Sequence, residues 1–373
     1  MTPTNPHASL TAECAEKQHR LQSLMSQQGL DAVLISRHEN IAWLTAGTVD
    51  IHVGMLRETG PASLLITREG GSFYVTTTNE AARLADEEFT TLPYQPLLRP
   101  WTSGDIEGSI RSVVPNGRVG TDIALGDCTL TNLQPLRLLL TAGEMDRYRW
   151  LGRQMAATAT KVLLTLEPGI SERAIQATLA QELISRCLIP SVYLGAVDRR
   201  VRTYPHPVPR AGVLEHFAIL CFCARYGGLA ASLTRFVHFG PMPEDLSDDF
   251  RVVSHVNARI QSATRVGASA AELFTVLRDA YAEADAPGGE QDHHQGGAAG
   301  YLEREWVARP DGAERLTSAQ AFAWNPSHRG AKVEDTRLLI GTACETLTRT
   351  PDLPEVITHL NGVSEVSAGV LIR

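Results

Sequence analysis

Several side chains in the second half of the chain are of the types that hydrolytic enzymes use. His206 lies between two prolines in YPHPVP, and Glu334 lies in KVEDT. His293 and His294 are adjacent in DHHQGG. An imidazole titrates near neutral pH, so one histidine can take a proton from water and return it to a leaving nitrogen, and a carboxylate can hold it in orientation. We therefore expect acid–base chemistry with His206, Glu334 and His294 as catalytic residues.

A cysteine and a serine add a nucleophilic alternative. Cys221 lies in FAILCFCARY and Ser232 in LAASLTRF, two runs whose Gly-Gly connection predicts a β-hairpin over residues 217–236. A thiol beside an imidazole can ionise and attack a carbonyl, but the apolar neighbours of Cys221 oppose ionisation. Ser232 is more readily explained as a small residue that fills space. Cys221 and Ser232 nevertheless remain candidate nucleophiles.

Each of these residues also has a structural interpretation. His206 suits an ordered loop, and the histidine pair suits a turn. Glu334 could form an ion pair with Lys332 or Arg337 on a strand. The glycines that follow the histidine pair, Gly296 first, more readily allow close backbone approach than chemistry.

The elements that must position these residues fall into two regions. Over roughly the first 135 residues, strand patterns such as PASLLIT and SFYVTTT alternate with helical patterns, which predicts an α/β domain. A helix pair, strands, a second helix pair (about 247–264 and 269–285) and a strand-rich end follow, which predicts an α+β domain of two similar halves. Because 373 residues exceed the size of one usual core, we expect domains at residues 1–141 and 142–373.

The composition argues against several classes of protein. The net charge is −8 and no basic stripe with interleaved aromatic residues occurs, so we expect no nucleic-acid partner. No apolar run is long enough to cross a bilayer, and the polar N-terminal stretch contains no apolar core of a secretory signal. The six cysteines are scattered apart from the Cys221–Cys223 pair, so we expect a cytoplasmic protein with reduced thiols.

Five segments in a fixed order resemble the creatinase, methionine aminopeptidase and prolidase superfamily. They are EMDRYRW…LEPGISERAI, YPHPVPR, GGLAASLTRFVHFG, HHQGGAAGYLEREW and WNPSHRGAKVEDTRLL. The first half, including NIAWLTAG, is similar to the N-terminal domain of creatinase and Xaa-Pro aminopeptidases. The resemblance covers nearly the whole chain. It implies an α/β N-terminal domain followed by an α+β pita-bread domain, which is a curved antiparallel sheet with two helix pairs related by a pseudo-twofold.

The resemblance also implies a metal site whose ligands are mostly missing. Metallopeptidases of the superfamily bind two divalent ions through two Asp, one His and two Glu side chains. The matching positions hold Cys221, Ser232, the segment 297–300, Asn325 and Glu334, so only the last ligand is kept. A catalytic zinc site needs about three protein ligands, and hard divalent ions need several oxygens. We therefore expect no metal cofactor, although a site rebuilt from cysteine, histidine and glutamate stays open.

Creatinase offers a metal-free precedent in the superfamily, because it hydrolyses a C–N bond of a guanidino acid with a histidine and glutamates. Its carboxylate-binding arginines match Arg57 and Arg304, and the counterpart of Arg57 reaches over from the neighbouring subunit. The resemblance therefore implies a homodimer and a small substrate with a carboxylate, which arginine binds well. The other expected substrate-binding residues are His293, Arg235, Asn325 and Cys221.

Three functions follow, in order of preference. The first is a metal-independent hydrolase or lyase of a C–N bond in a small carboxylate-bearing molecule, such as an amidino, ureido or acyl-amino acid. The second is a pita-bread protein that binds a ligand or partner without catalysis, because fold does not fix function. The third is a metallopeptidase of the Xaa-Pro type with a rebuilt site. A cavity filled by Trp324, Phe222 or Tyr204 favours the second.

Overall fold

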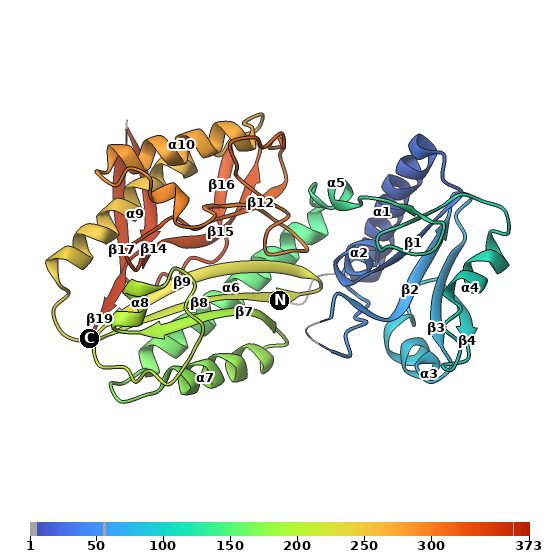
Figure 1. Cartoon of the computed structure of the whole chain (residues 1–373), viewed down its shortest axis with the longest axis horizontal. Coiled ribbons are helices and arrows are strands. Elements are labelled where there is room, and N and C mark those ends of the chain that lie inside the picture. The colour runs from blue at the N-terminus through green and yellow to red at the C-terminus, as the bar shows by residue number, and fades with distance from the viewer. Residues whose placement is uncertain (1–5, 55–56, 361) are drawn as a thin grey trace. The chain divides into compact units, whose positions relative to one another are not determined.

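The structure, a computed structural model, describes residues 6–54, 57–360 and 362–373. The chain divides into two compact units, Met1–Glu144 and Met145–Arg373. In Figure 1 the first unit is coloured blue to teal and the second green to red. Each unit has its own sheet and helices, and each is described here by itself.

The N-terminal unit is built on a six-stranded mixed sheet in the order β4-β3-β2-β1-β5-β6. Its strands are β1 (Ala32–Arg37), β2 (Thr59–Thr67), β3 (Ser72–Thr77), β4 (Gln95–Arg99), β5 (Val119–Thr121) and β6 (Thr129–Leu130). Its helices are α1 (Pro6–Gln28), α2 (His38–Leu44), α3 (Ala81–Arg83), α4 (Ile106–Val113) and α5 (Gln134–Arg137). The predicted α/β class is confirmed.

Strand β1 is the buried centre of this sheet. Leu34 packs in a cluster with Ile110 of α4, and its neighbours Val33 and Ile35 are also fully buried. Because successive side chains of a strand point to opposite faces, both faces of β1 are covered. The preceding helix ends where Gly29 adopts φ +64°, a left-handed conformation that suits glycine at a helix end.

The segment between β3 and β4 contains only a short helix. It has the three-residue α3 followed by a π-helical turn, Leu84–Glu88. No side chain caps the start of α3, so the segment lacks the hydrogen bond that a Thr or Asn cap supplies.

The C-terminal unit is built on a nine-stranded curved sheet whose main path is β11-β10-β12-β15-β9-β8-β7. The strands of the unit are β7 (Ile189–Val197), β8 (Phe217–Tyr226), β9 (Leu229–His238), β10 (Gly296–Ala299), β11 (Trp306–Val307), β12 (Gln320–Trp324), β13 (Ser327–His328), β14 (Ala331–Lys332), β15 (Glu334–Ile340), β16 (Ala343–Thr346), β17 (Glu355–Leu360), β18 (Val363–Ala368) and β19 (Val370–Ile372). Strands β16 and β19 complete the nine-stranded sheet, whereas β13–β14 and β17–β18 form separate two-stranded sheets. Its helices are α6 (Ala142–Thr165), α7 (Glu172–Ile184), α8 (Arg199–Thr203), α9 (Glu244–Ala263) and α10 (Ala270–Glu283).

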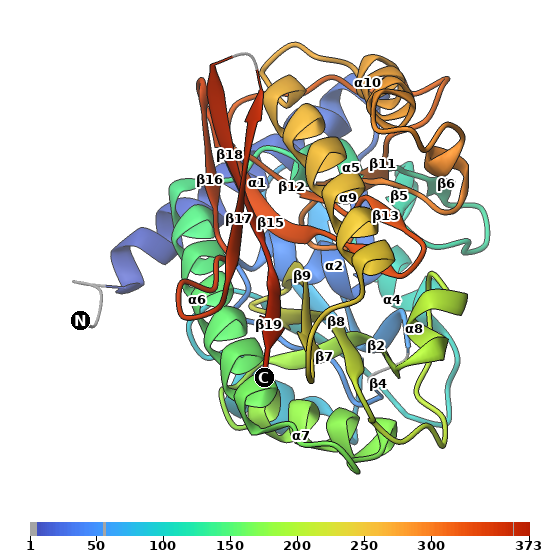
Figure 2. The same cartoon turned by 90° about the vertical axis from the view of Figure 1, so that its left-hand side faces the viewer.

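Two helix pairs accompany this sheet, α6 with α7 and α9 with α10 (Figure 1). The second helix of each pair begins at a serine: Ser171 accepts a hydrogen bond from the Ala174 amide, and Ser269 forms a capping box with Glu272. Helix α9 lies beside the β17–β18 hairpin (Figure 2). The helix pair followed by strands thus occurs twice, and the predicted curved antiparallel sheet with two helix pairs is confirmed. Within the described residues, no helix has both the length and the apolar character to cross a bilayer.

Candidate functional site

The strand register of the C-terminal sheet gathers the predicted polar residues on one face. In the β8–β9 hairpin, Cys221 lies opposite Thr234 and Cys223 lies opposite Ser232. Strand β15 adds Glu334 opposite Thr234. Alternate residues of a strand share a face, so these five side chains form one polar face, which we call the Glu334 face. The predicted hairpin is confirmed.

Two cations contact Glu334, one at each carboxylate oxygen. Arg304 Nη2 donates to Oε1 at 2.9 Å, and Lys332 Nζ lies 3.2 Å from Oε2. The Thr234 hydroxyl donates to Oε2 at 2.7 Å, and Cys221 Sγ lies 3.5 Å from the same oxygen. Both lone-pair regions of the carboxylate are therefore in use.

These contacts fix the charges at the face. Burial by itself would raise the pKa of Glu334, but Lys332 and Arg304 lower that pKa far below its usual value. Burial would lower the pKa of Lys332, but its ion pair with Glu334 raises it. Two cations against one carboxylate leave one net positive charge.

The thiols of this face are not ionised at neutral pH. Burial raises the pKa of Cys221, and it also raises the pKa of Cys223, whose sulfur lies 3.1 Å from the Ser232 hydroxyl. A neutral thiol is a much poorer nucleophile than a thiolate. Neither Cys221 nor Ser232 has a described hydrogen bond to His206, so the geometry does not favour a Cys–His or Ser–His pair.

The three predicted histidines lie together. The ring centroid of His206, in the loop after α8, is 5.2 Å from that of His293 and 5.9 Å from that of His294. The two adjacent rings are 5.6 Å apart. His293 Nδ1 bonds the His294 carbonyl, and its Nε2 lies 2.6 Å from the Ser327 hydroxyl. Since a carbonyl only accepts, Nδ1 carries the proton and Nε2 accepts from Ser327.

All three imidazoles are neutral at neutral pH. Burial, followed by the charge of Lys332, lowers the pKa of His206, and burial lowers the pKa of His293 to about 3. Burial and the charge of Arg304 lower the pKa of His294 to about 4. Ser327, which His293 contacts, lies opposite Lys332 in the β13–β14 pair, so the histidine cluster lies near the Glu334 face. Among the described contacts, however, no hydrogen bond joins Glu334 to His206, and Glu334 does not take the predicted orienting role directly.

Two predicted substrate-binding residues lie at this site with little freedom to move. Arg304 Nη1 donates to the Ser232 hydroxyl at 3.2 Å and to the Glu303 carbonyl at 2.7 Å, in addition to its bond to Glu334. Asn325 is 2% exposed, and among the described residues its Oδ1 has no hydrogen-bond partner. Arg304 is thus already bonded by protein groups, and Asn325 retains a buried acceptor.

Arg235, in contrast, points to the opposite face of the sheet. It is 1% exposed and bonds Asp335 at 2.6 Å, the Thr350 hydroxyl at 2.8 Å and the Thr348 carbonyl at 2.7 Å. Strand alternation separates it from Thr234 and Glu334. We correct its predicted role from substrate binding to a structural one, which joins β9 to β15.

Arg57 belongs to the N-terminal unit, where its side chain is exposed. Its predicted role at a neighbouring subunit's site stays a prediction.

The sequence indicated Lys332 only as a possible ion-pair partner of Glu334, although Lys332 is central to the site. Its side chain is 4% exposed and contacts both Glu334 and Cys221, the latter with an Nζ–Sγ distance of 3.4 Å. The spacing in KVEDT was a usable signal, because residues two apart on an extended chain share a side.

A divalent ion does not fit the donor set at this face. Glu334 is the one carboxylate among its five members, and the ammonium and guanidinium groups that contact both oxygens would repel a metal. Among the described residues, the groups that could chelate a metal are His38, Asp50 and His52 of the N-terminal unit. There, the two rings stack in parallel with centroids 3.4 Å apart, and His52 Nδ1 bonds Asp50 Oδ1.

The aromatic residues that could have filled the site lie elsewhere. Trp324 is fully buried and donates from Nε1 to the Thr264 hydroxyl at 3.0 Å. Phe222 alternates with the two cysteines and so faces away from them. Tyr204 is 48% exposed.

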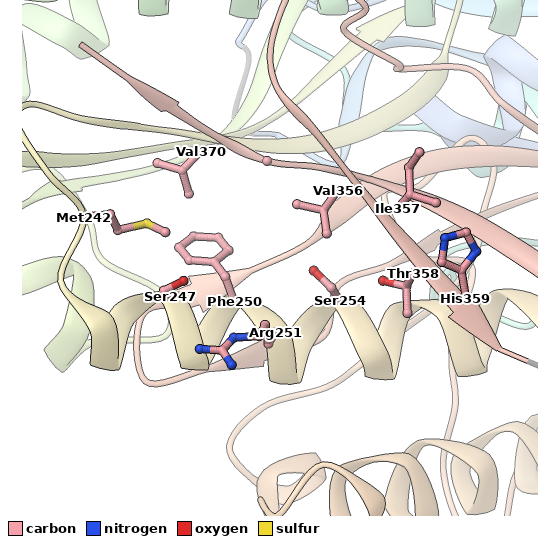
Figure 3. A pocket seen from close by; sticks show the side chains of 11 residues that line it. Met242, Ser247, Phe250, Arg251, Ser254, Val356, Ile357, Thr358, His359 and Val370 are labelled. Carbon is pink, nitrogen blue, oxygen red and sulfur yellow. The ribbon is translucent and has the colours of Figure 1, made fainter.

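Two cavities of the C-terminal unit are also separate from the histidines. One, of about 490 Å³, lies between helix α9 and strands β17 and β19, which carry Val356 and Val370, with Phe250 and Met242 in its wall (Figure 3). The other, of about 280 Å³, is lined by polar groups that include Arg235 and Asp335. Neither is lined by Glu334 or by the histidine cluster.

Comparison with known families decides the relationship. Residues 17–141 match the creatinase/prolidase N-terminal domain, and residues 147–338 match metallopeptidase family M24. The chain belongs to metallopeptidase family M24. This confirms the superfamily expected from the sequence, and membership supports a hydrolase that acts on C–N bonds, as expected. A search of curated protein sequences found no match.

Solved structures with the same fold include peptidases and a domain of a FACT complex subunit. An Xaa-Pro dipeptidase from Bacillus anthracis is 18% identical, with a TM-score of 0.75 over 96% of this chain and 100% of that chain. A prolidase from Pyrococcus horikoshii OT3 is 17% identical, with a TM-score of 0.74 over 90% and 98%. The N-terminal domain of the FACT complex subunit SPT16 from Cicer arietinum is 11% identical, with a TM-score of 0.65 over 90% and 97%. At these identities the likeness concerns the fold.

Proposed function

We propose that this member of family M24 is a metal-independent hydrolase of a C–N bond in a small carboxylate-bearing substrate. The observation that carries the proposal is a cluster of three neutral imidazoles that contacts Ser327, the strand partner of Lys332, near a carboxylate held by two cations. The imidazoles supply groups that move protons, and the net positive charge suits an anionic substrate.

His206 is the proposed general base and acid. The residue is open to solvent on one side, but its ring packs against His293 and His294, and its lowered pKa keeps the ring unprotonated at neutral pH. The ring takes a proton from water as the water oxygen bonds to the substrate carbon. The resulting imidazolium then returns the proton to the leaving nitrogen as the C–N bond breaks, so the histidine ends as it began.

His293 and His294 take a different part in this proposal. Their pKa values of about 3 and about 4 make them weak bases. They act as neutral hydrogen-bonding groups, with His294 the more exposed of the two. The expected catalytic role of His294 is therefore to orient substrate or water.

Lys332 and Arg304 provide the positive charge that a substrate carboxylate would meet. Because Arg304 already bonds three protein groups, we place its role in electrostatic attraction rather than in a free bidentate grip. Asn325 offers a buried acceptor for a substrate N–H. A homodimer that completes the site through Arg57, and a cytoplasmic location, remain part of the proposal.

A non-catalytic binding function is the second candidate. It is favoured by the contacts that occupy both oxygens of Glu334 and by the position of the two cavities away from the histidines. A binding protein would retain the charged face without using His206 for proton transfer.

The test is a hydrolysis screen with guanidino, ureido and N-acyl amino acids together with Xaa-Pro dipeptides, in the presence of a chelator. We expect turnover of at least one compound, and a loss of about 10²–10⁴-fold in His206→Ala with little change in melting temperature. His216→Ala, which removes another exposed histidine of the same unit, is the control. Turnover that His206→Ala leaves unchanged would refute the base assignment, and activity that requires added metal would refute metal independence.

A further inference from the structure

Two cations, Lys332 and Arg304, contact Glu334, the single expected metal ligand that this chain keeps. We propose that the Lys332 ammonium and the Arg304 guanidinium replace the two divalent ions of the family's peptidases and form a fixed recognition site for an anionic group. The inference rests on the metal-free part of the proposed function and adds the groups that take over from the metal.

The two cations divide the carboxylate between them. Arg304 binds Oε1 of Glu334 and Lys332 binds Oε2, at 2.9 and 3.2 Å. A carboxylate that bridges two metal ions offers one oxygen to each ion in the same way. The nitrogen–oxygen distances are those of charge-assisted hydrogen bonds and are longer than metal–oxygen bonds of about 2.0–2.2 Å.

Each cation also contacts a residue that stands at a lost ligand position. Lys332 Nζ lies 3.4 Å from Cys221 Sγ, and Arg304 Nη1 lies 3.2 Å from Ser232 Oγ. These two residues match the positions of the two aspartates. The cations and the substitutions therefore occur at the same places.

Charge balance explains why the substitutions belong together. Two divalent ions carry four positive charges, which four carboxylates can neutralise. Two side-chain cations carry only two charges, so four buried carboxylates would be left with uncompensated charge, which is costly in a protein interior. Neutral Cys221, Ser232 and Asn325 in place of three ligands leave Glu334 as the single anion. One positive charge remains for a ligand.

A free donor points to the chemistry of that ligand. Arg304 Nε is buried and has no hydrogen-bond partner among the described residues. Guanidinium N–H groups bind carboxylate and phosphate oxygens well. A small carboxylate is the ligand that this charge and donor favour.

A double-mutant cycle on Lys332 and Glu334 tests the replacement without relying on turnover. Glu334→Gln leaves two neighbouring buried cations without their anion, and we expect its melting temperature to fall by about 10 °C or more. Lys332→Met keeps the length of the side chain and leaves a neutral Glu334–Arg304 pair, so we expect a smaller fall. The double variant should be more stable than Glu334→Gln alone. Effects that simply add would refute the coupling.

Ligand titrations test the two remaining parts of the inference by thermal shift. Zn²⁺ or Mn²⁺ should shift the wild type and Glu334→Gln equally, and any common shift should disappear in His52→Ala. A metal shift that Glu334→Gln abolishes would refute the replacement. N-acetylglycine should stabilise the wild type and not Arg304→Met, whereas no difference between these two would refute anion recognition. Coupling and carboxylate binding without hydrolysis would leave this inference standing and refute the proposed hydrolase.

Discussion

At the scale of single residues, the chemistry of this site depends on which groups are charged. The imidazoles are neutral because burial and nearby cations disfavour their protonation, whereas Glu334 is ionised because the same cations contact it. One pair of cations thus produces opposite effects on acidic and basic neighbours.

The pH dependence of the reaction follows from His206. The neutral ring is the active base, and its pKa is lowered from 6.5. We expect kcat/KM to rise with pH through an apparent pKa below 6.5 and to be level at neutral pH. A pH–rate profile of the wild type, with His206→Gln as the variant that lacks this rise, is the measurement. A rise only in the alkaline range, as a thiol with a raised pKa would give, would contradict the assignment.

At the scale of elements, the two faces of one sheet serve different purposes. The Glu334 face carries the polar groups of the site, and the opposite face carries the Arg235–Asp335 pair, which also bonds Thr348 and Thr350. Because strands β9 and β15 contribute alternate residues to both faces, the pair that fixes their alignment also sets the spacing between Thr234 and Glu334.

Removal of one partner of this pair should destabilise the C-terminal unit. Arg235→Met leaves the Asp335 carboxylate buried beside Thr348 without its cation, and we expect a loss of about 3–5 kcal/mol. The control is Arg349→Met, which breaks a solvent-exposed pair with Glu355 and should cost less than about 1 kcal/mol. Urea unfolding curves of the two variants give the comparison. Equal and small losses would contradict the structural role of Arg235.

At the scale of the whole molecule, we propose a homodimer in which Arg57 of one subunit serves the proposed site of the other. This exposed residue belongs to the N-terminal unit, and the resemblance to creatinase implies that it reaches over to the neighbouring subunit. Such an assembly makes each site depend on two chains.

Subunit complementation provides a specific test. Arg57→Ala and His206→Ala should each lose activity as homodimers. In an equal random mixture, half of the dimers are mixed and each mixed dimer has one intact site, so about a quarter of the wild-type activity should return. The measurement is turnover after co-expression, with light scattering to establish the dimer. A monomer, or a mixture no more active than its parents, would contradict a shared site.

The sequence by itself determined the α/β and α+β classes of the two units and the β8–β9 hairpin, because these depend on local patterns. The pita-bread architecture and the missing metal ligands followed from its resemblance to the creatinase superfamily. The sequence could not decide which face a side chain occupies or which groups pair across distant strands. Lys332 and Arg304 meet at Glu334, and Arg235 turns away from it, only once the register of β9 with β15 is fixed. A shift of one residue would exchange the two faces, and that register is a property of the folded sheet.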